Sequence, residues 1–245
     1  MHSSTLIMVL SVTGSLASVL PRAEDPAFKF QMAPDKASRS PCPVLNALAN
    51  HGYLPRDGTN ITMDQLKFAF SKALNIDEKV TVSLSTPALT TSTTGNASTV
   101  NLADMVKHNV IEHDGSLSRA DQAVTGNANK FDATVWNQVK AQFTGPTIDI
   151  KTMAKARSIR ISAAMAENPQ FNLTPAQVKT SFAESAFILG VMAADFKAPI
   201  APTQFINIIF EQERFPFNEG FKTSATKVTG DQVDALGAAI MKATA

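Results

Sequence analysis

The chain has 245 residues, and 44% of them are hydrophobic, which is enough apolar material for a substantial buried core. The 22 Lys and Arg residues nearly balance the 21 Asp and Glu residues, and no basic cluster points to nucleic acid as a partner. A single cysteine excludes an intrachain disulfide and also a metal site built from several thiolates, such as a zinc ribbon or an iron–sulfur cluster.

The N-terminal segment is typical of a secretory signal peptide, which we place at residues 1–17. Residues 5–20 are apolar or small, and Ser15-Leu16-Ala17 offers a small-x-small cleavage site before the first charge, Arg22. An amphipathic or disordered arm is the alternative. The stretch is too short to cross a membrane comfortably, so we expect a secreted protein without a membrane contact. Three glycosylation triplets agree with an extracellular glycoprotein, and they begin at Asn60, Asn96 and Asn172.

Residues 18–40 lack periodicity and predict an extended arm, whereas residues 41–245 read as one helical domain. Thr62 to Gln65 form a capping box that opens a helix to Leu74, and Thr174 to Gln177 repeat the device before a helix that runs to about Ala194. Hairpin signals are absent, and a polar loop is expected over 86–99. An all-α, multi-helix single domain follows, with further helices expected at 43–50, 77–85, 101–112, 118–124, 132–141, 150–166, 203–213 and 230–243.

The single cysteine occupies a distinctive position. Cys42 lies between Pro41 and Pro43, directly before the predicted helix 43–50, so its sulfur is at a helix N-terminus. The free N–H groups and the positive end of the helix dipole favour the thiolate there. A buried, inert cysteine, a metal or haem ligand, and a nucleophile with His51 or His113 as its base are the alternatives.

Two carboxylates flank an imidazole in the sequence Glu112-His113-Asp114-Gly115-Ser116. If a helical turn persists there, Glu112 and Ser116 face one way and can bind a hard cation such as Mg²⁺. Asp114 is placed to hold the His113 ring in one tautomer. A solvated acidic helix end is the alternative interpretation.

Glu184 is the only charged residue between Phe182 and Ala194. Its helical neighbours Phe187 and Ile188 place the carboxyl on an apolar face, so we expect a raised pKa that suits a general acid and base. A glutamate at the edge of the apolar stripe that reaches water is the alternative.

Together these segments resemble the fungal haem-thiolate peroxidases, meaning chloroperoxidase and the short unspecific peroxygenases. The first segment extends from Pro41-Cys42-Pro43 through the run from Asn46 to Pro55. The second is the Glu112 to Ser116 motif and the third is Glu184-Ser185-Ala186-Phe187. The resemblance spans about residues 30–225 and keeps the family's order.

The resemblance implies a haem b cofactor with Cys42 as the axial thiolate, tempered by backbone N–H groups near Val44 and Leu45. Thiolate donation favours cleavage of the O–O bond of H₂O₂. Glu184 would transfer the proton between the two peroxide oxygens. His113, oriented by Asp114, would pair with Glu184.

The same resemblance implies a Mg²⁺ or Mn²⁺ ion held by Glu112, Ser116, the His113 backbone carbonyl and a haem propionate. Phe187 would line the channel beside Glu184. Ile111 stands where chloroperoxidase has Phe, which affects the channel shape and halogenation. The disulfide of chloroperoxidase and the C-terminal cysteine of some short peroxygenases have no counterpart, so we expect a monomer or a non-covalent homodimer. The long-type peroxygenase pattern does not match, because His113 replaces its Gly.

The expected activity is H₂O₂-dependent oxygenation, by hydroxylation or epoxidation, of small apolar or aromatic substrates, with one-electron and halide oxidation as side activities. The alternatives are a dedicated oxidase of a secondary-metabolite pathway and a non-catalytic haem-binding protein. A cysteine hydrolase built on Cys42 and a histidine is a further alternative.

Overall fold

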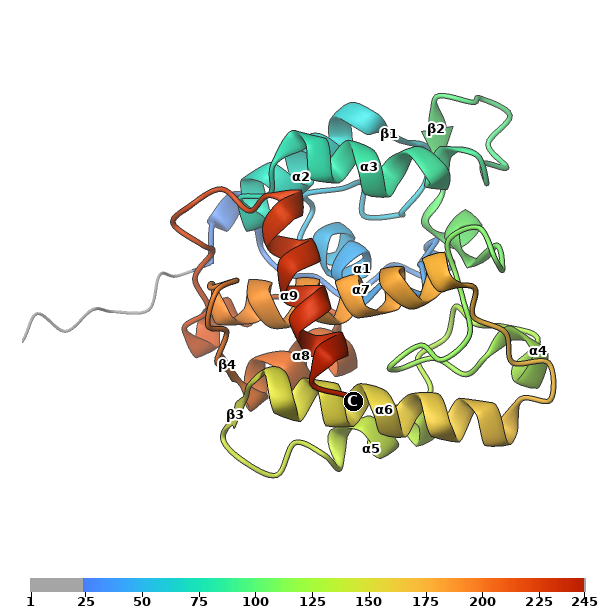
Figure 1. Ribbon diagram of the computed structural model, residues 1–245. Helices are drawn as coiled ribbons and strands as arrows, with labels where there is room; N and C mark the ends of the chain where they lie inside the picture. Colours follow the sequence, from blue (N-terminus) through green and yellow to red (C-terminus); the bar gives the residue numbers. More distant parts are fainter. Residues whose placement is uncertain (1–23, 245) are drawn as a thin grey trace, which may run out of the picture.

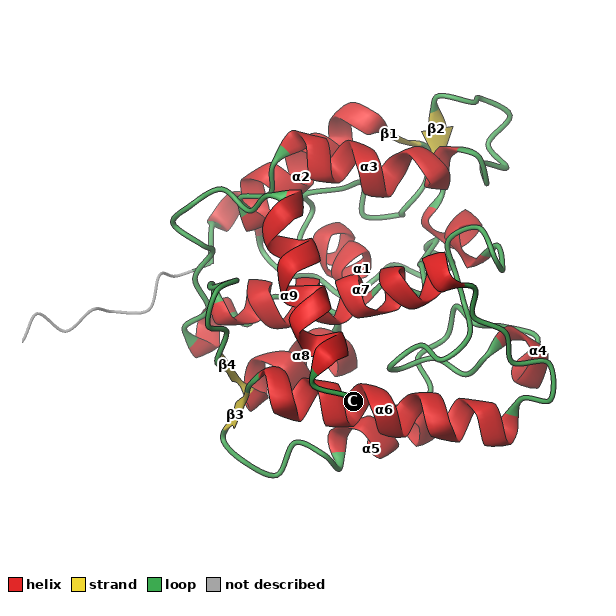
Figure 2. Cartoon of the chain, in the orientation of Figure 1, coloured by secondary structure: helices red, strands yellow, loops and turns green. Residues whose placement is uncertain are grey.

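The computed structural model describes residues 24–244, so the signal peptide expected at 1–17 lies outside the described residues. From residue 24 to residue 40 the chain contains a single short 3₁₀ helix, Pro26–Phe28, and is otherwise without helix or strand. The described chain is mainly helical, as Figure 2 shows, which confirms the all-α expectation. The α-helices are α1 (Pro43–Asn50), α2 (Met63–Leu74), α3 (Glu78–Leu89), α4 (Gln122–Thr125), α5 (Ala133–Lys140), α6 (Ile150–Glu167), α7 (Pro175–Ala193), α8 (Thr203–Gln212) and α9 (Gly230–Lys242).

Helix α7 runs through the middle of the molecule, and α9 crosses in front of it in Figure 1. Helices α6 and α8 also contact α7, while α2 and α3 pack against each other. Helix α1 lies behind α7 in this view, and every residue from Val44 to Asn50 is buried. The short helix that begins after Cys42 is therefore part of the core.

The capping boxes predicted from the sequence are both present. Thr62 accepts a hydrogen bond from the Gln65 N–H at 3.2 Å, and Gln65 accepts one from the Thr62 N–H at 2.9 Å. Thr174 and Gln177 repeat the arrangement at the start of α7. These reciprocal bonds satisfy N–H groups that the first turn of a helix leaves unpaired, which explains why both helices begin where expected.

Three predicted elements differ from the structure. The helix expected at 101–112 is only a 3₁₀ helix, Leu102–Val106, because a parallel bridge between His108 and Glu112 replaces helical bonding beyond it. In place of the helix expected at 118–124, the chain forms only the four-residue helix α4, from Gln122 to Thr125. Helix α3 continues through Pro87 to Leu89, so the polar loop starts later than residue 86.

The strands are short and pair far-apart segments instead of forming hairpins. Strand β1 (Ile61–Thr62) pairs antiparallel with β2 (Thr99–Val100), with Ile61 opposite Val100. Strand β3 (Thr147–Ile148) pairs with β4 (Ala201–Pro202), with Ile148 opposite Ala201. Both pairs fasten loops at helix ends.

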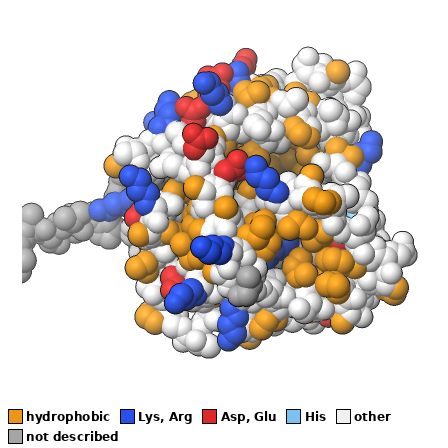
Figure 3. Space-filling model, viewed as in Figure 1, with side chains coloured by type: hydrophobic (Ala, Val, Ile, Leu, Met, Phe, Trp, Pro, Cys, Tyr) orange, Lys and Arg blue, Asp and Glu red, His pale blue; other side chains and the backbone are white. Residues whose placement is uncertain are grey.

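The surface carries both signs of charge. Figure 3 shows Lys, Arg, Asp and Glu side chains interspersed with hydrophobic ones on the face that α9 crosses. Asn60, Asn96 and Asn172, which begin the three glycosylation triplets, are all exposed. Among residues 24–244, no helix combines the length and apolar character needed to span a bilayer.

Candidate active site

Cys42 is the N-cap residue of α1, with extended backbone angles and Pro43 as the first helical residue. Proline has no N–H to lose in the first turn, so it starts the helix directly after the cysteine. The backbone N–H groups of Leu45 and Val44 lie beside the sulfur and lower the pKa of Cys42. Burial has the larger effect, however, and leaves the pKa of Cys42 raised above that of a free thiol.

The chain leading to Cys42 is fixed by Asn46. The Ser40 N–H donates to Asn46 Oδ1 at 2.8 Å, and Asn46 Nδ2 donates to the Ser40 carbonyl at 2.9 Å. The Cys42 N–H donates in turn to Ser40 Oγ at 3.1 Å. Because Asn46 is on the first turns of α1, these bonds hold the sulfur in a set position relative to the helix axis.

Glu184 lies in the middle of α7, at the boundary between the buried core and an accessible region. Its side chain is 58% exposed, although the adjacent Ser185 and Ala186 are fully buried. Its negative charge raises the pKa of Cys42, so the carboxylate and the sulfur face the same region between α7 and the start of α1. The carboxylate is therefore accessible although its chain neighbours belong to the core.

Glu184 and His113 form an ion pair, with Glu184 Oε2 3.3 Å from His113 Nε2. Burial lowers the pKa of His113, but the charge and hydrogen bond of Glu184 outweigh it and raise the pKa to about 9. Desolvation by the surrounding protein atoms raises the pKa of Glu184, but the charge and hydrogen bond of His113, together with the charge of Arg157, bring it below the ordinary value. The raised pKa that the apolar helix face predicted for Glu184 is therefore wrong, because the pattern of one helix takes no account of the cations His113 and Arg157 on other elements.

The second ring nitrogen of His113 contacts the backbone of Asp114. His113 Nδ1 lies 2.8 Å from the Asp114 carbonyl oxygen, which makes Nδ1 the donor. The Asp114 carboxylate does not orient the ring as expected, and its Oδ2 instead accepts the Asn172 N–H at 2.9 Å. Asp114 thus connects the His113 segment to the chain entering α7.

Glu112 is buried with one oxygen engaged and one free. Its Oε2 lies 2.6 Å from His108 Nδ1, whereas Oε1 has no hydrogen-bond partner among the described residues. Burial raises the pKa of Glu112, and His108 opposes this. Residues 112–116 form no helical turn, so the geometric reason for expecting Glu112 and Ser116 on one face is wrong. The described residues include no group of three or more His, Cys, Asp or Glu arranged for a metal ion.

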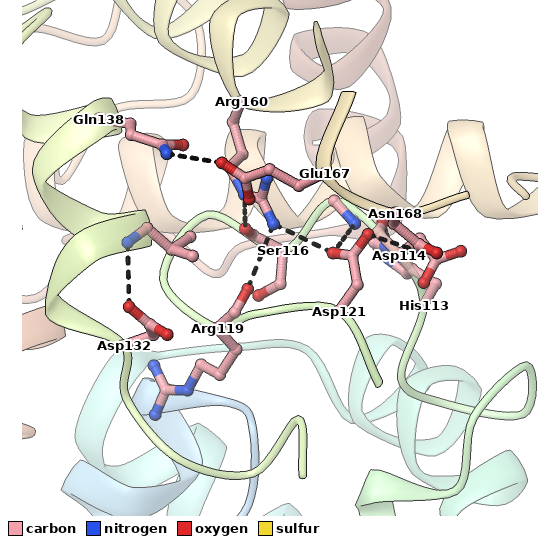
Figure 4. Close-up of polar contacts among 12 residues, drawn as sticks. His113, Asp114, Ser116, Arg119, Asp121, Asp132, Gln138, Arg160, Glu167 and Asn168 are labelled. Atoms are coloured by element: carbon pink, nitrogen blue, oxygen red, sulfur yellow. Dashed lines mark hydrogen bonds and ion pairs between the residues drawn. The ribbon is translucent and has the colours of Figure 1, made fainter. Parts of the chain in front are cut away.

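A buried polar network holds the segment from His113 to Ser116, as Figure 4 shows. Asp121 Oδ1 accepts the Gly115 N–H at 2.8 Å and pairs with Arg160 Nη2 at 3.0 Å. Arg160 Nε also donates to the Ser116 carbonyl at 2.8 Å, and Asn168 Nδ2 donates to Asp121 Oδ2. Helix α6 and its C-terminal end thereby fix the loop that presents His113.

Arg157 contributes a second buried cation from α6. Its Nη1 donates to the Gly115 carbonyl, and burial lowers its pKa to about 10. Sequence analysis missed Arg157 and Arg160. Their spacing from Met153 and Ala164 places all four residues on one face of α6, and that face is buried. The helical period could therefore have predicted that the two arginines are buried.

The remaining candidates lie in different places. Phe187 follows Glu184 by one turn, is half-buried, and contacts Phe70 edge to face with ring centroids 6.2 Å apart. Ile111 is half-buried against the core. His51 is at the opposite end of α1 from Cys42 and bonds to the backbone of Phe28, so it is not a base for the thiol.

Two surface clefts among the described residues lie away from the candidate site. The larger, of about 660 Å³, lies between the segment before α1 and the end of α8, and its lining includes Arg39 and Phe131. The other borders Tyr53 and Phe68. Neither cleft is lined by Cys42 or Glu184. The candidate site is therefore identified by the chemistry of its side chains and not by a cleft.

The donor set fits a haem group and a divalent cation. The Cys42 sulfur is at a helix N-terminus, with the Leu45 and Val44 N–H groups beside it. This environment suits a negatively charged thiolate that ligates haem iron. The unpartnered Glu112 Oε1 is a buried carboxylate oxygen of the kind that a hard cation satisfies. Glu184, whose charge raises the pKa of Cys42, has an accessible carboxylate.

Comparisons with known proteins agree with this chemistry. The profile of the family described as "Peroxidase, family 2" matches residues 28–226. The aromatic peroxygenase of Cyclocybe aegerita is 31% identical over 169 residues, which cover 61% of this chain and 45% of that protein. The chloroperoxidase of Leptoxyphium fumago is 42% identical over 101 residues, 38% of this chain and 27% of that protein. The aromatic peroxygenase of Coprinellus radians is 29% identical over 168 residues, 61% of this chain and 64% of that protein.

In each case the match spans less than two thirds of the relative's own length.

Proposed function

Because the chain belongs to peroxidase family 2, we propose that it is a haem-thiolate peroxygenase that uses H₂O₂ to oxygenate small apolar or aromatic molecules. The observation that supports this proposal is the ion pair of His113 with Glu184, whose carboxylate raises the pKa of Cys42 at the N-terminus of α1. One-electron oxidation and halide oxidation are proposed as side activities.

Cys42 would hold the iron of haem b through its sulfur. When bound, a thiolate-ligated haem supplies the cleavage of the O–O bond and the oxidising power for the substrate. The N–H groups of Val44 and Leu45 would temper the charge of the sulfur, and the Ser40 and Asn46 bonds would keep it aligned with α1.

Glu184 would act as the acid and base on the opposite side. Its lowered pKa makes it a carboxylate at neutral pH, ready to accept the proton from one oxygen of H₂O₂. Returning that proton to the other oxygen lets it leave as water. His113, kept protonated by its raised pKa, would stabilise the carboxylate and hold its orientation. Phe187 and Ile111 would form apolar walls beside it.

Glu112 would bind Mg²⁺ or Mn²⁺ together with Ser116 and the His113 carbonyl. The free Glu112 Oε1 supports this assignment, and His108 fixes the other oxygen. We further propose secretion, glycosylation at the exposed triplets and a monomer or non-covalent dimer, since Cys42 is needed as a ligand and no other cysteine exists.

The optical spectrum of the purified protein, reduced under carbon monoxide, tests the proposal. We expect a strongly red-shifted ferrous carbonyl Soret band in the wild type and its loss in Cys42→Ala. Absence of haem, or a histidine-type spectrum that Cys42→Ala leaves unchanged, contradicts haem-thiolate ligation. A thiolate spectrum without any H₂O₂-dependent oxidation identifies a non-catalytic haem-binding protein instead.

A further inference from the structure

The carboxylate of Glu213 joins parts of the chain that are far apart in sequence. Its Oε1 atom accepts hydrogen bonds from Arg119 Nη2 at 2.7 Å and from Asn46 Nδ2 at 2.8 Å. Its backbone carbonyl accepts a third from Asn50 Nδ2 at 3.1 Å. Asn46 and Asn50 are on α1, so Glu213 ties the helix that starts after Cys42 to the end of α8.

Glu213 adopts an unfavourable backbone conformation to make these contacts. It is the C-cap residue of α8, with φ 47° and ψ 47°, in the left-handed region that glycine prefers. A bulky acidic residue persists in this region when surrounding contacts hold it there. The bonds to Arg119, Asn46 and Asn50 are such contacts, and they fix where the carboxylate points.

Arg119 is a buried cation whose charge reaches Cys42. It is 1% exposed, and among the described residues its ion-pair partner is Glu213. Its Nη1 donates to Ser118 Oγ at 2.7 Å, and the guanidinium lies 6.0 Å from the centre of the Phe131 ring. The positive charge of Arg119 lowers the pKa of Cys42, and the charge of Cys42 raises the pKa of Arg119.

The ion pair is bonded to the first turns of the helix that follows Cys42, through Asn46. Asn46 follows Cys42 by four residues, so the two side chains share a face of α1. Asn46 shares the Glu213 oxygen with Arg119 and also fixes the Ser40 segment that leads into Cys42. The pair thus borders the cysteine loop without touching the acid–base groups on α7.

We propose that Arg119 and Glu213 are positioning residues that set the electrostatic field at the axial sulfur: Arg119 stabilises its negative charge, and Glu213 limits that stabilisation. The inference rests on the proposed function, because it requires haem iron bound to Cys42. It goes further in assigning opposite electrostatic effects to two residues that do not touch the peroxide side of the site.

The reduction potential of the ferric–ferrous couple in the holoprotein tests the two effects. In Glu213→Gln, the amide oxygen can still accept bonds, but Arg119 becomes an uncompensated buried cation. The potential should then become more positive, because reduction lowers the positive charge on the iron. In Arg119→Gln, the carboxylate is left without its cation and the potential should become more negative. The double variant should return toward the wild-type value.

A merely structural role does not produce shifts of opposite sign that cancel. Shifts of the same sign, or no shift in Glu213→Gln, overturn the inference. Arg119→Lys keeps the charge and should keep the potential. If Arg119→Gln fails to fold, the positive shift in Glu213→Gln together with an unchanged potential in Arg119→Lys carries the test, and a shift in Arg119→Lys as large as that in Glu213→Gln overturns the inference. Glu78→Gln, which removes a charge from the surface pair with Lys67, is the matched control and should leave the potential unchanged.

The same samples separate this inference from the proposed function. A wild-type protein without the red-shifted carbonyl band contradicts both. A wild-type protein with that band, combined with potentials that do not respond to Glu213→Gln or Arg119→Gln, leaves haem-thiolate ligation in place and overturns the charge-tuning inference alone.

Discussion

The Nε2 atom of His51 accepts a hydrogen bond from the backbone N–H of Phe215, with the two nitrogens 3.0 Å apart. The other ring nitrogen, Nδ1, donates to the Phe28 carbonyl at 3.0 Å and lies 2.9 Å from Glu24 Oε1. The neutral ring therefore joins the end of α1 to the chain after α8 and to the N-terminal arm. Burial lowers the pKa of His51, and the Phe28 carbonyl and Glu24 only partly oppose this.

This contact predicts a loss of stability in acid. Because the folded-state pKa of His51 is below the unfolded value of about 6.5, the stabilisation is present above that pH. It is lost as pH falls through the folded-state pKa, when protonation removes the acceptor for the Phe215 N–H. His51→Gln keeps an acceptor but does not titrate. Thermal unfolding between pH 7.5 and 5 should show a smaller fall in Tm for His51→Gln than for the wild type, and parallel curves contradict the prediction.

Replacing Glu184 by Gln should abolish most peroxide activation while leaving haem binding intact. An amide cannot take the proton from H₂O₂, and loss of a general acid–base typically costs about 10²–10⁴-fold in rate. Stopped-flow mixing of the holoprotein with H₂O₂ measures this rate directly. The exposed Glu167→Gln on α6 is the control and should react as the wild type does. An unchanged rate in Glu184→Gln, with the carbonyl band preserved, would sink the acid–base role.

Replacing Glu112 by Gln should weaken binding of the divalent cation. The free Oε1 of Glu112 is the charged oxygen that we assign to the cation. We expect an affinity loss of more than ~10-fold, and a smaller loss for His108→Gln, since His108 only orients the carboxylate. Metal analysis after dialysis, with Glu78→Gln as the surface control, checks this order. Equal cation content in Glu112→Gln and the wild type would contradict the assignment.

Gly190 should not tolerate a side chain. A Cβ atom there would lie 2.5 Å from Cε1 of the Phe196 ring, which packs on this point of α7. We therefore expect Gly190→Ala to lower the free energy of unfolding by about 1–3 kcal/mol, as overpacking does in a filled core.

Urea unfolding measures the effect, and Gly145→Ala is the control, because its nearest neighbour would be the Thr147 carbonyl at 3.8 Å. The control should change stability by less than about 0.5 kcal/mol. Equal midpoints for the two variants would show that Phe196 can move aside at little cost.

Local patterns were sufficient for most helices. Periodicity and capping residues placed α1, α2 and α7 to within a residue, because a capping box and an apolar stripe are properties of neighbouring residues. The expectation of a helix over 101–112 was wrong, because an apolar stripe does not show which other local bonds compete with the helix. The side chains of His108 and Glu112 bond to each other and their backbones form a bridge. This arrangement cannot be recognised from the spacing of apolar residues.

The sequence also identified the chemical groups of the site. Pro41-Cys42-Pro43 before a helix, the Glu112 to Ser116 motif and Glu184 on an apolar face were visible without coordinates. The pKa of Glu184, by contrast, could not be predicted from the pattern of its own helix. The pKa of Glu184 is lowered because His113 and Arg157 approach it from other elements, and the apolar pattern of α7 alone predicted the opposite.

Sequence by itself therefore determined most of the helical elements, the position of the thiol at a helix start and the carboxyl that we propose as the acid and base. The family resemblance also implied that His113 pairs with Glu184, as it does in the structure. Only the tertiary structure decided that Arg157 binds the Gly115 carbonyl and that Arg119 meets Glu213 across 94 residues of chain. The physical reason is range. Helix formation is governed by residues three or four apart, whereas buried charges are paired by packing between elements whose spacing in sequence carries no periodic signal.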